Sequence, residues 1–325
     1  MITKHCDRCG RPLEHWGKTA AGTIRFFCPS CKITTTWNRD DVEKRHSLHQ
    51  LEDWLGGKDS LTEIASKEHK TRQALWKEFH KLFGERINEP VIPPHTKVRV
   101  LILDATYIHG HTLCALVAID EDDNLYWRFA PYESYKVWCE FLSHFSEPEI
   151  VVMDGQKGLF AAARTLWPHV PVQRCQFHVI SFAIQYLGRK PKEQVGKDLI
   201  NILYSLKDAK TLEGKDVWLR SYIAWERKYD FLISARDRSG HFMHPRLRST
   251  RLIMRKALPY LFTFLNHQNA PNTTNLVEGW VNGAVAEALR FHRGLRVHEK
   301  KALVSIVLSR LRRQKSKNVI QKDLI

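Results

Sequence analysis

Three acidic residues stand where a metal-dependent site could form. Asp104 ends the apolar run 98–104, Asp154 follows the apolar run 150–153, and Glu278 lies far downstream. A carboxylate at the end of a buried strand must be solvated by some partner, and a divalent cation serves this purpose well. Carboxylate ligands favour Mg²⁺ or Mn²⁺. Three such acids in a strongly basic chain indicate metal-dependent phosphoryl chemistry on nucleic acid.

The charge of the chain also favours a nucleic-acid partner. Its 325 residues include 51 Lys and Arg against 35 Asp and Glu, a formal net charge of +16, and such an excess attracts polyanions. The basic residues gather in two stretches, 236–256 and 290–317. Charge runs are often only solvated faces, but two of them beside a metal-type acid set favour contacts to the DNA backbone. Binding through such contacts would fall steeply with salt.

Composition argues against several other classes of protein. Hydrophobic residues make up 43% of the chain and charged residues 26%, so we expect two or three globular domains rather than disorder. No apolar run reaches the roughly 18 residues of a membrane span, and the N-terminus lacks a basic-then-apolar signal pattern. We therefore expect no export and no membrane partner, and a cytoplasmic location.

The N-terminal segment carries two Cys-x-x-Cys pairs, Cys6 with Cys9 and Cys28 with Cys31. Each pair can direct two thiolates at one ion from a tight turn, and two pairs complete a tetrahedral four-sulfur shell. Strand-forming residues lie between the pairs and after the second pair, which is the layout of a zinc ribbon. Without an export signal, these cysteines indicate metal ligation rather than disulfides. We predict a structural zinc ribbon in residues 1–40, and contact of the ribbon with DNA stays open.

Residues 41–84 show the apolar spacing of helices. A pair of glycines ends the first helix, and Ser60 with Glu63 forms a capping box at the start of a short second helix. A third helix begins near Thr71. Two short helices joined by a tight turn are the arrangement of a helix-turn-helix.

In such a motif the second helix reads base edges near its N-terminal end. The residues that this helix would expose there are Arg72, Gln73 and Lys77. The alternative is a small helical bundle that merely packs. Several prolines then mark a linker, so we assign residues 41–95 to a DNA-binding region and linker.

From residue 98 the pattern changes to that of strands. The predicted strands cover residues 98–104, 112–119, 125–130 and 150–153. The first three read as an antiparallel meander, and the fourth is continuously apolar, as a central parallel strand would be. A helix is expected over 134–145. This is the order of a ribonuclease H-like fold, in which the first and fourth strands are neighbours, so Asp104 and Asp154 would meet at one edge. The acids of the turn 120–123 compete by number, but a hairpin tip is an ordinary solvated place for acids.

Four motifs resemble those of the DDE transposases of bacterial insertion sequences related to plant Mutator elements. They are the sequences Leu-Asp-Ala-Thr-Tyr around Asp104, Met-Asp-Gly around Asp154, Cys-Gln-Phe-His ending at His178, and Thr-Thr-Asn-Leu-Val-Glu ending at Glu278. The resemblance extends over nearly the whole chain. It implies that Asp104, Asp154 and Glu278 are the catalytic residues and hold Mg²⁺ or Mn²⁺.

The resemblance also implies the domain plan and the partners. It places a helical insertion at about 185–270 inside a catalytic domain of residues 96–325. Aromatic residues would give that insertion its own apolar surface: Trp218, Tyr222, Trp225, Tyr229 and Phe231. The expected partners are double-stranded DNA, as element terminal repeats and as target, and a second copy of the chain on paired ends. A transposase of this kind would associate with the bacterial nucleoid.

Cys175 and His178 stand three residues apart, and hence on one face if they are helical. Two interpretations stay open for them: a satisfied buried pair near the active site, or a role in orienting the acids or contacting DNA. The last segment, 284–313, reads as helix, and three arginines follow the presumed catalytic helix closely enough for phosphate contact: Arg290, Arg293 and Arg296.

The sequence therefore predicts an α/β protein: a ribonuclease H-like core with an all-helical insertion, preceded by a zinc ribbon and a helix-turn-helix. Its expected function is metal-dependent DNA cleavage at element ends and strand transfer into target DNA. One alternative is a DNA-binding regulator with an inactive core, which the three intact acids argue against. Another is a different nuclease of the same fold, which would seldom need two N-terminal DNA-reading modules and a helical insertion.

Overall fold

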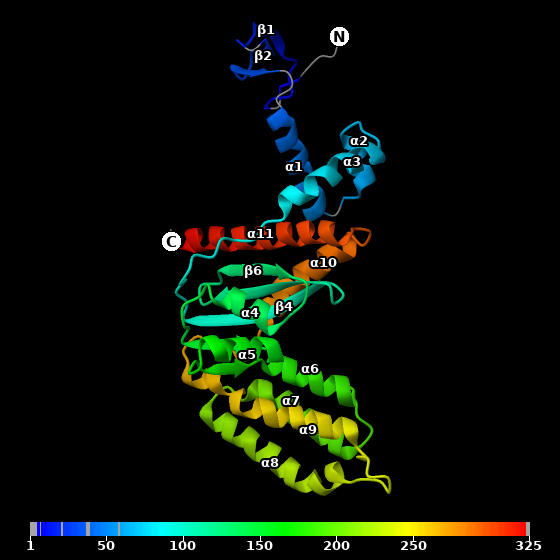
Figure 1. Ribbon diagram of the computed structural model, residues 1–325, viewed down its shortest axis with the longest axis vertical. Coiled ribbons are helices and arrows are strands. Elements are labelled where there is room, and N and C mark those ends of the chain that lie inside the picture. The colour runs from blue at the N-terminus through cyan, green and yellow to red at the C-terminus, as the bar shows by residue number, and fades with distance from the viewer. Residues whose placement is uncertain (1–4, 7, 21, 37–39, 58, 323–325) are drawn as a thin grey trace. The chain divides into compact units, whose positions relative to one another are not determined.

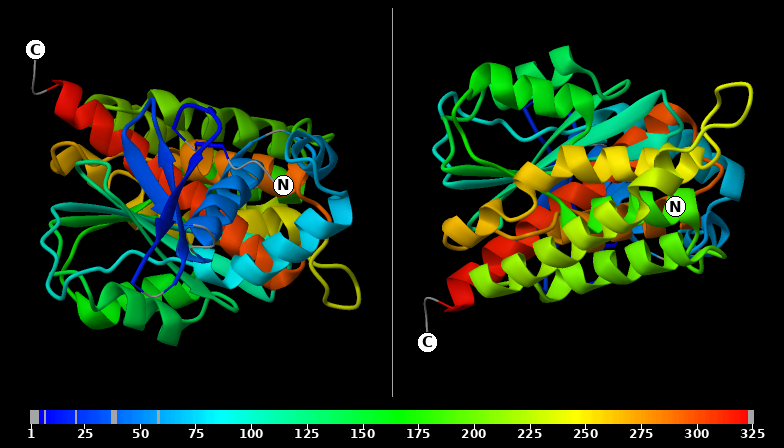
Figure 2. Two further views of the ribbon diagram at one scale, coloured as in Figure 1. Left: turned by 90° about the horizontal axis from the view of Figure 1, so that it is seen from above. Right: turned by 90° about the horizontal axis from the view of Figure 1, so that it is seen from below.

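The structure, a computed structural model, describes residues 5–6, 8–20, 22–36, 40–57 and 59–322, with the side chains of 40–43 and 314–322 left out. The chain divides into two compact units, Met1–Phe83 and Gly84–Ile325. Figures 1 and 2 show the course of the chain through both units. None of the described helices combines the length and the apolar character needed to cross a membrane.

The first unit begins with a small antiparallel sheet. Its strands are β1 (Glu14–Lys18), β2 (Ile24–Cys28) and β3 (Ile33–Thr36), in the order β1-β2-β3. All five residues of β1 are exposed, so this sheet has little apolar core. Segments of this size usually need a disulfide, a bound metal or a similar cross-link for stability.

Three helices complete the first unit: α1 (Asp40–Gly56), α2 (Leu61–Lys67) and α3 (Arg72–Leu82). The expected capping box is confirmed, because Glu63 N–H donates to the Ser60 hydroxyl and Ser60 N–H donates to the Glu63 carboxylate. Thr71 caps α3 by accepting from Ala74 N–H. A short 3₁₀ turn, η1 (Phe83–Arg86), follows α3.

The second unit is built on a five-stranded mixed sheet in the order β6-β5-β4-β7-β8. The strands are β4 (Val100–His109), β5 (Leu113–Asp120), β6 (Leu125–Ala130), β7 (Ile150–Met153) and β8 (Val172–Arg174). The pairs β4–β5 and β5–β6 are antiparallel, whereas β4–β7 and β7–β8 are parallel. The expected meander, the parallel fourth strand and the mixed α/β class are confirmed.

The expected end of the first core strand at Asp104 is wrong. β4 continues to His109 because its antiparallel pairing with β5 runs that far, whereas its parallel pairing with β7 stops at Leu103. Asp104 is therefore the first residue of β4 beyond its parallel partner.

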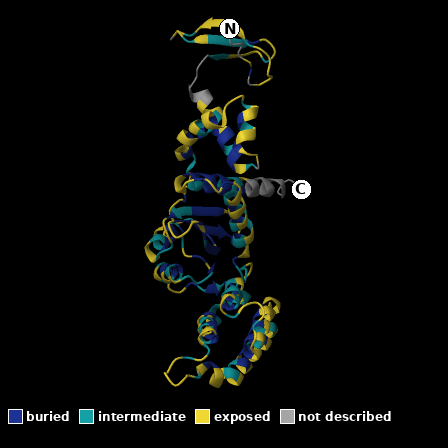
Figure 3. Ribbon diagram, turned by 90° about the vertical axis from the view of Figure 1, so that its right-hand side faces the viewer, coloured by how far each residue is buried: buried dark blue, intermediate teal, exposed yellow. Residues whose placement is uncertain are grey.

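Helices cover both faces of this sheet. On one face α4 (Tyr135–Leu142) and α5 (Lys157–Leu166) pack on side chains such as Leu101, Leu103 and Met153. The opposite face meets α10 (Gly283–Phe291) and α11 (Val297–Lys322), with α11 in contact with β4 and β6 (Figures 1 and 2). Because neighbours along a strand alternate between faces, Asp104 points away from the face that Leu103 supplies to the core. Figure 3 shows the buried residues concentrated in these strands.

A helical segment lies between β8 and the C-terminal helices. Its elements are α6 (Gln176–Leu187), α7 (Gln194–Ser205), η2 (Leu206–Asp208), α8 (Leu212–Ser234), α9 (Pro245–Ala257), η3 (Leu258–Tyr260), η4 (Thr263–Asn266) and the π-helix η5 (Leu276–Asn282). Of the aromatics expected inside, Trp218, Tyr222 and Trp225 are buried. Tyr229 packs at the edge of this cluster. The expectation for Phe231 is wrong: this residue is 91% exposed and takes no part in the apolar cluster, to which α8 contributes Trp218, Tyr222, Trp225 and Ile233.

The single helix expected over 284–313 is also wrong, because α10 and α11 are separate helices. Residues 292–296 separate them, and this stretch contains Gly294, a residue of low helix propensity. The new helix begins where Arg296 N–H donates to the Glu299 carboxylate at 2.7 Å, which satisfies an otherwise unpaired amide at its start.

Candidate active site

Asp104 is a buried carboxylate in the centre of the sheet, with only 6% of its surface exposed. Its Oδ1 accepts a hydrogen bond from Ala105 N–H at 2.8 Å, whereas Oδ2 has no hydrogen-bond partner among the described residues. Burial raises the pKa of Asp104 to about 7; the charge of His178 opposes this rise and that of Asp154 adds to it. A buried carboxylate with an unsatisfied oxygen is costly unless a cation completes it.

Asp154 lies beside Asp104 because of strand register. Leu103 of β4 is aligned with Met153 of β7 in the parallel pair, so the residues that follow each of them emerge at the same edge of the sheet. Gln156 N–H donates to Asp154 Oδ1 at 2.8 Å and fixes the carboxylate at the start of the next turn. The register of β4 and β7 therefore places Asp104 and Asp154 side by side, as we expected from the strand order.

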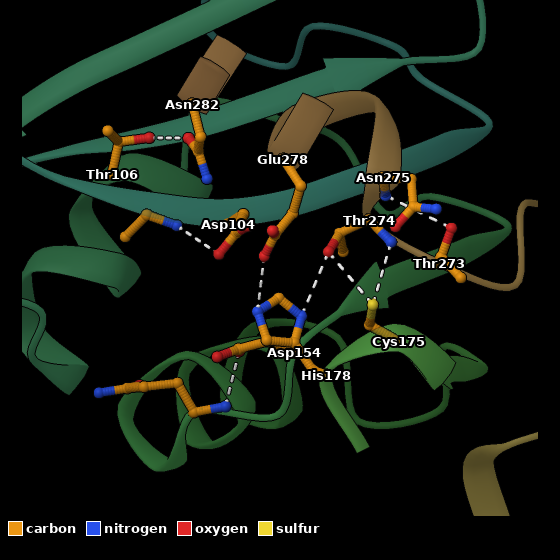
Figure 4. A network of polar contacts seen from close by, with 12 residues as sticks. Asp104, Thr106, Asp154, Cys175, His178, Thr273, Thr274, Asn275, Glu278 and Asn282 are labelled. Carbon is orange, nitrogen blue, oxygen red and sulfur yellow. Dashed lines mark hydrogen bonds and ion pairs between the residues drawn. The ribbon is translucent and has the colours of Figure 1, made fainter. Parts of the chain in front are cut away.

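Glu278 reaches the same place from η5. Glu278 N–H bonds to the Thr274 carbonyl at 3.0 Å. The Thr106 hydroxyl of β4 donates to the Asn282 side chain, which ties the end of η5 to the strand that carries Asp104 (Figure 4). π-Helical turns are rare and occur frequently at functional sites.

The Cys-x-x-His motif and the segment before Glu278 contact each other directly. Thr274 N–H donates to Cys175 Sγ at 3.2 Å, and the Thr274 hydroxyl lies 3.3 Å from the same sulfur. That hydroxyl also lies 3.4 Å from His178 Nδ1, while His178 Nε2 pairs with Glu278 Oε1 at 2.8 Å. Cys175 thus holds the segment that carries Glu278, and His178 holds the carboxylate itself.

The surroundings of His178 favour the charged form of its ring. Burial disfavours its charged form, but the hydrogen bond with Cys175 and the charges of Asp104 and Asp154 outweigh burial and raise the pKa of His178 to about 9. The acidic side chains around His178 therefore favour the protonated form of its imidazole.

The four side chains converge on one space, from elements far apart in the sequence (Figure 4). An oxygen of Asp104, an oxygen of Asp154 and a ring nitrogen of His178 all lie within 4.8 Å of one another, and Glu278 joins them through its ion pair with His178. Oxygen donors that dominate such a set suit Mg²⁺ or Mn²⁺. The unsatisfied oxygen of Asp104 also fits a site built for a cation.

Sequence reasoning missed two charged residues near this space. The Glu133 carboxylate accepts from Trp138 Nε1 at 3.3 Å, and burial together with the charge of Asp154 raises the pKa of Glu133. Arg174 is the last residue of β8, next to Cys175. Its place at the carboxyl end of a parallel strand was a usable signal, whereas nothing in the pattern around Glu133 separated it from a surface acid.

The first unit holds a cluster of four cysteine sulfurs that all lie within 4.8 Å of one another: those of Cys6, Cys9, Cys28 and Cys31. Cys6 and Cys28 are buried, and Cys9 Sγ and Cys28 Sγ are 3.6 Å apart. The turn after the first pair needs Gly10, whose φ is +69° and whose N–H donates to the Cys6 carbonyl at 2.8 Å.

This cluster fits a tetrahedral zinc ion. Contact with Cys9, burial and contacts with Cys28 and Cys6 raise the pKa of the Cys31 thiol to about 12. Four crowded thiolates require a cation to share their charge, and Zn²⁺ with four cysteine ligands is the usual solution. The prediction of a zinc ribbon therefore fits the cysteine geometry.

The residues proposed to contact DNA, five arginines and lysines and one glutamine, are all exposed. Arg72, Gln73 and Lys77 lie in the first two turns of α3, and Arg290, Arg293 and Arg296 lie at the end of α10 and in the stretch before α11. Contact of these side chains with DNA stays a prediction.

Comparison with known proteins gives a consistent assignment. A family model described as transposase, Mutator family, matches residues 97–278, more than half of the chain, and its last residue is Glu278. The chain is also 30% identical over 172 residues to the transposase for insertion sequence element ISRM5 from Rhizobium meliloti (strain 1021). That similarity covers 47% of this chain and 40% of the relative, so the chain spans less than half of that protein's length. The family match establishes that the chain belongs to the Mutator family of transposases.

Proposed function

We propose that this protein is a DDE transposase that cleaves DNA at the ends of its element and joins those ends to target DNA. One observation carries the proposal: Asp104, Asp154 and Glu278 converge around His178 from three distant segments. Membership of the Mutator family supplies the expectation that such a site acts on DNA.

The core that carries these acids is proposed to have a ribonuclease H-like fold. Three antiparallel strands, a helix and a parallel strand beside the first one support this assignment. Helices α7, α8 and α9, between α6 and the glutamate, then form the insertion expected at about 185–270. Residues 96–325 would be the catalytic domain, with residues 1–40 and 41–95 before it.

Asp104, Asp154 and Glu278 would hold two Mg²⁺ or Mn²⁺ ions. When bound, such ions activate the attacking oxygen of a phosphodiester reaction and stabilise the leaving oxygen. The amides of Ala105 and Gln156 each fix one oxygen of an aspartate, which leaves the second oxygen for ligation. His178 holds the Glu278 carboxylate and sets its orientation.

One site can serve both chemical steps because only the nucleophile changes. A water molecule first attacks the phosphate at the element end and releases a strand with a 3′-hydroxyl. That hydroxyl then attacks a phosphate of the target DNA, and the target strand leaves with its own 3′-hydroxyl. Each step exchanges one P–O bond for another, so neither needs an external energy source.

The first unit is proposed to recognise the element ends. A zinc ribbon around the four cysteines and a helix-turn-helix made of α2 and α3 are supported by the sulfur cluster and by the tight turn at His69, whose φ is +52°. In such a motif α3 would read bases near its N-terminus. We propose a homodimer that holds two ends together.

Substitutions in α3 test this assignment. Arg72→Ala and Lys77→Ala each remove an exposed cation near the helix start. We expect each to weaken binding to an element-end duplex and to lower the slope of log affinity against log salt by about 1. Lys81→Ala, at the other end of the same helix, should leave the slope unchanged. Equal effects of all three variants would argue against recognition by α3.

Replacement of His178 tests how Glu278 is positioned. In His178→Asn the charge and one of the two contacts are lost, so we expect cleavage to slow roughly 10- to 100-fold, as for outer residues that orient metal ligands. DNA binding should stay the same, and a higher Mg²⁺ concentration should recover part of the rate. His169→Asn, which changes an exposed histidine before β8, is the matched control. A wild-type rate in His178→Asn would contradict the positioning role.

The proposed function itself is tested with purified protein, Mg²⁺ and a labelled duplex that carries the element's terminal repeats. Joining of the labelled strand to target DNA supports transposition. Hydrolysis without joining supports a nuclease, and binding with neither reaction supports a regulator with an inactive core.

A further inference from the structure

Arg174 is a half-buried arginine without a partner beside the proposed active site. Its Nε atom is buried and makes no hydrogen bond, and its guanidinium forms no ion pair with any described residue. Two other arginines of the second unit that are not exposed do have carboxylate partners: Arg251 pairs with Asp230 at 2.6 Å and Arg128 pairs with Glu89 at 3.0 Å. An arginine that loses water without gaining a partner is costly.

The backbone around Asp154 is shaped to admit this side chain. Met153 of β7 is aligned with Arg174 of β8 in the parallel pair, which brings the arginine next to the Asp154 turn. Gly155 has a φ of +80°, and a Cβ atom added there would lie 1.8 Å from Arg174 Cζ and 1.9 Å from Nη1. The guanidinium therefore occupies the space that a side chain at position 155 would need.

The negative charge of Asp154 favours the charged form of Arg174, although the two side chains form no ion pair. Burial lowers the pKa of Arg174, and the charge of Asp154 opposes that shift; an arginine nevertheless stays protonated in proteins. The net result is a fixed positive charge at the edge of an acidic site. No described residue accepts a hydrogen bond from this guanidinium.

We infer that Arg174 binds a phosphate oxygen of the DNA strand held at the Asp104–Asp154–Glu278 site. A guanidinium presents a planar set of donors that matches a phosphate. The acids and their ions would hold one side of the phosphodiester, and Arg174 would supply the opposite donor at the scissile phosphate or the one next to it. This inference rests on the proposed function, because it names the group that the site contacts.

The experiment uses the full chain and a series of element-end duplexes, each with one phosphate near the cleavage position replaced by a neutral methylphosphonate. For wild-type protein one replacement should slow cleavage and weaken binding far more than its neighbours. Arg174→Ala should cleave unmodified DNA roughly 100-fold more slowly than wild-type protein. The methylphosphonate that slows the wild-type protein most should change the cleavage rate of Arg174→Ala by no more than about twofold, because the contact is already lost. Arg174→Lys should recover part of the rate, because it restores the charge without the planar fork.

Two further variants separate this contact from general damage. Gly155→Ala keeps every charge but puts a methyl group in the guanidinium's place, so it should lower cleavage and flatten the methylphosphonate profile as Arg174→Ala does. Arg99→Ala removes an exposed arginine, paired with Glu149 at 3.0 Å, from the opposite end of the β4–β7 pair, and it should retain the wild-type profile. If Arg174→Ala does not fold, Arg174→Lys and Gly155→Ala carry the same comparison.

The outcomes distinguish the two levels of the argument. If wild-type protein cleaves the duplex and Arg174→Ala keeps the wild-type profile at a lower rate, the arginine is structural and the inference is wrong. If wild-type protein cleaves nothing, the proposed function fails, and the binding profiles alone decide the inference. Binding profiles of wild-type protein and Arg174→Ala that differ at one phosphate support the contact, and identical binding profiles overturn it.

Discussion

Asp104→Asn is expected to abolish both strand cleavage and strand transfer while DNA binding persists. The amide keeps the shape of the side chain but removes the charge of a carboxylate that is 6% exposed and has one unsatisfied oxygen. Loss of several kcal/mol of transition-state stabilisation by bound ions corresponds to a rate loss of at least about 10³-fold. Single-turnover assays with a labelled element end measure the rate, and a gel-shift titration of the same duplex measures binding.

Asp122→Asn is the matched control for this variant. Asp122 is an exposed acid of the β5–β6 hairpin tip, and its replacement should leave both reactions at the wild-type rate. A variant at Asp104 that lost DNA binding together with activity would count against the catalytic assignment. So would a variant that retained either reaction.

Cys28→Ser is expected to unfold the ribbon and release its zinc. Cys28 is fully buried at the end of β2, and every residue of β1 is exposed, so the small sheet has no core to replace the metal. In zinc-finger peptides at neutral pH, binding of a structural zinc ion contributes an apparent free energy of about 10–16 kcal/mol to folding. We expect wild-type protein to contain one zinc per chain and the variant to contain none. Limited proteolysis should cut the variant within residues 1–36.

The effect should stay local to the first unit. The second unit has its own apolar core, so fragments of it should resist protease in Cys28→Ser as in wild type. Cys139→Ser, which alters a half-buried thiol of α4, should retain the zinc. A Cys28→Ser protein that still held one zinc and a protease-resistant N-terminus would show that these cysteines do not form the site.

The placement of the two aspartates could be predicted because it depends on local pattern and strand order. The continuously apolar run before Asp154 indicated a buried parallel strand, and such a strand after a meander and a helix pairs with the first strand. The exact length of β4 could not be predicted in the same way. Its continuation to His109 depends on pairing with β5, which is a property of two strands together.

The position of Glu278 depends on tertiary contacts that periodicity does not contain. No spacing rule predicts a π-helix, and η5 is held by the Thr106–Asn282 hydrogen bond and by the Thr274 contacts with Cys175 and His178. The spacing of Cys175 and His178 showed that they share a face, but their two different partners became clear only in the structure. Arg174 was missed although it ends a parallel strand, and the carboxyl ends of the parallel strands β7 and β8 lie at the same edge of the sheet.

Iron-directed cleavage of the polypeptide tests the central claim most directly, that three distant acids hold ions in one place. Fe²⁺ takes carboxylate sites in place of Mg²⁺, and with ascorbate and peroxide it cuts the backbone close to where it binds. The predicted result is a set of cuts near Asp104, Asp154 and Glu278 together, which excess Mg²⁺ suppresses and Asp104→Asn removes. Cuts near only one of these residues, or cuts that Mg²⁺ does not suppress, would contradict a shared site.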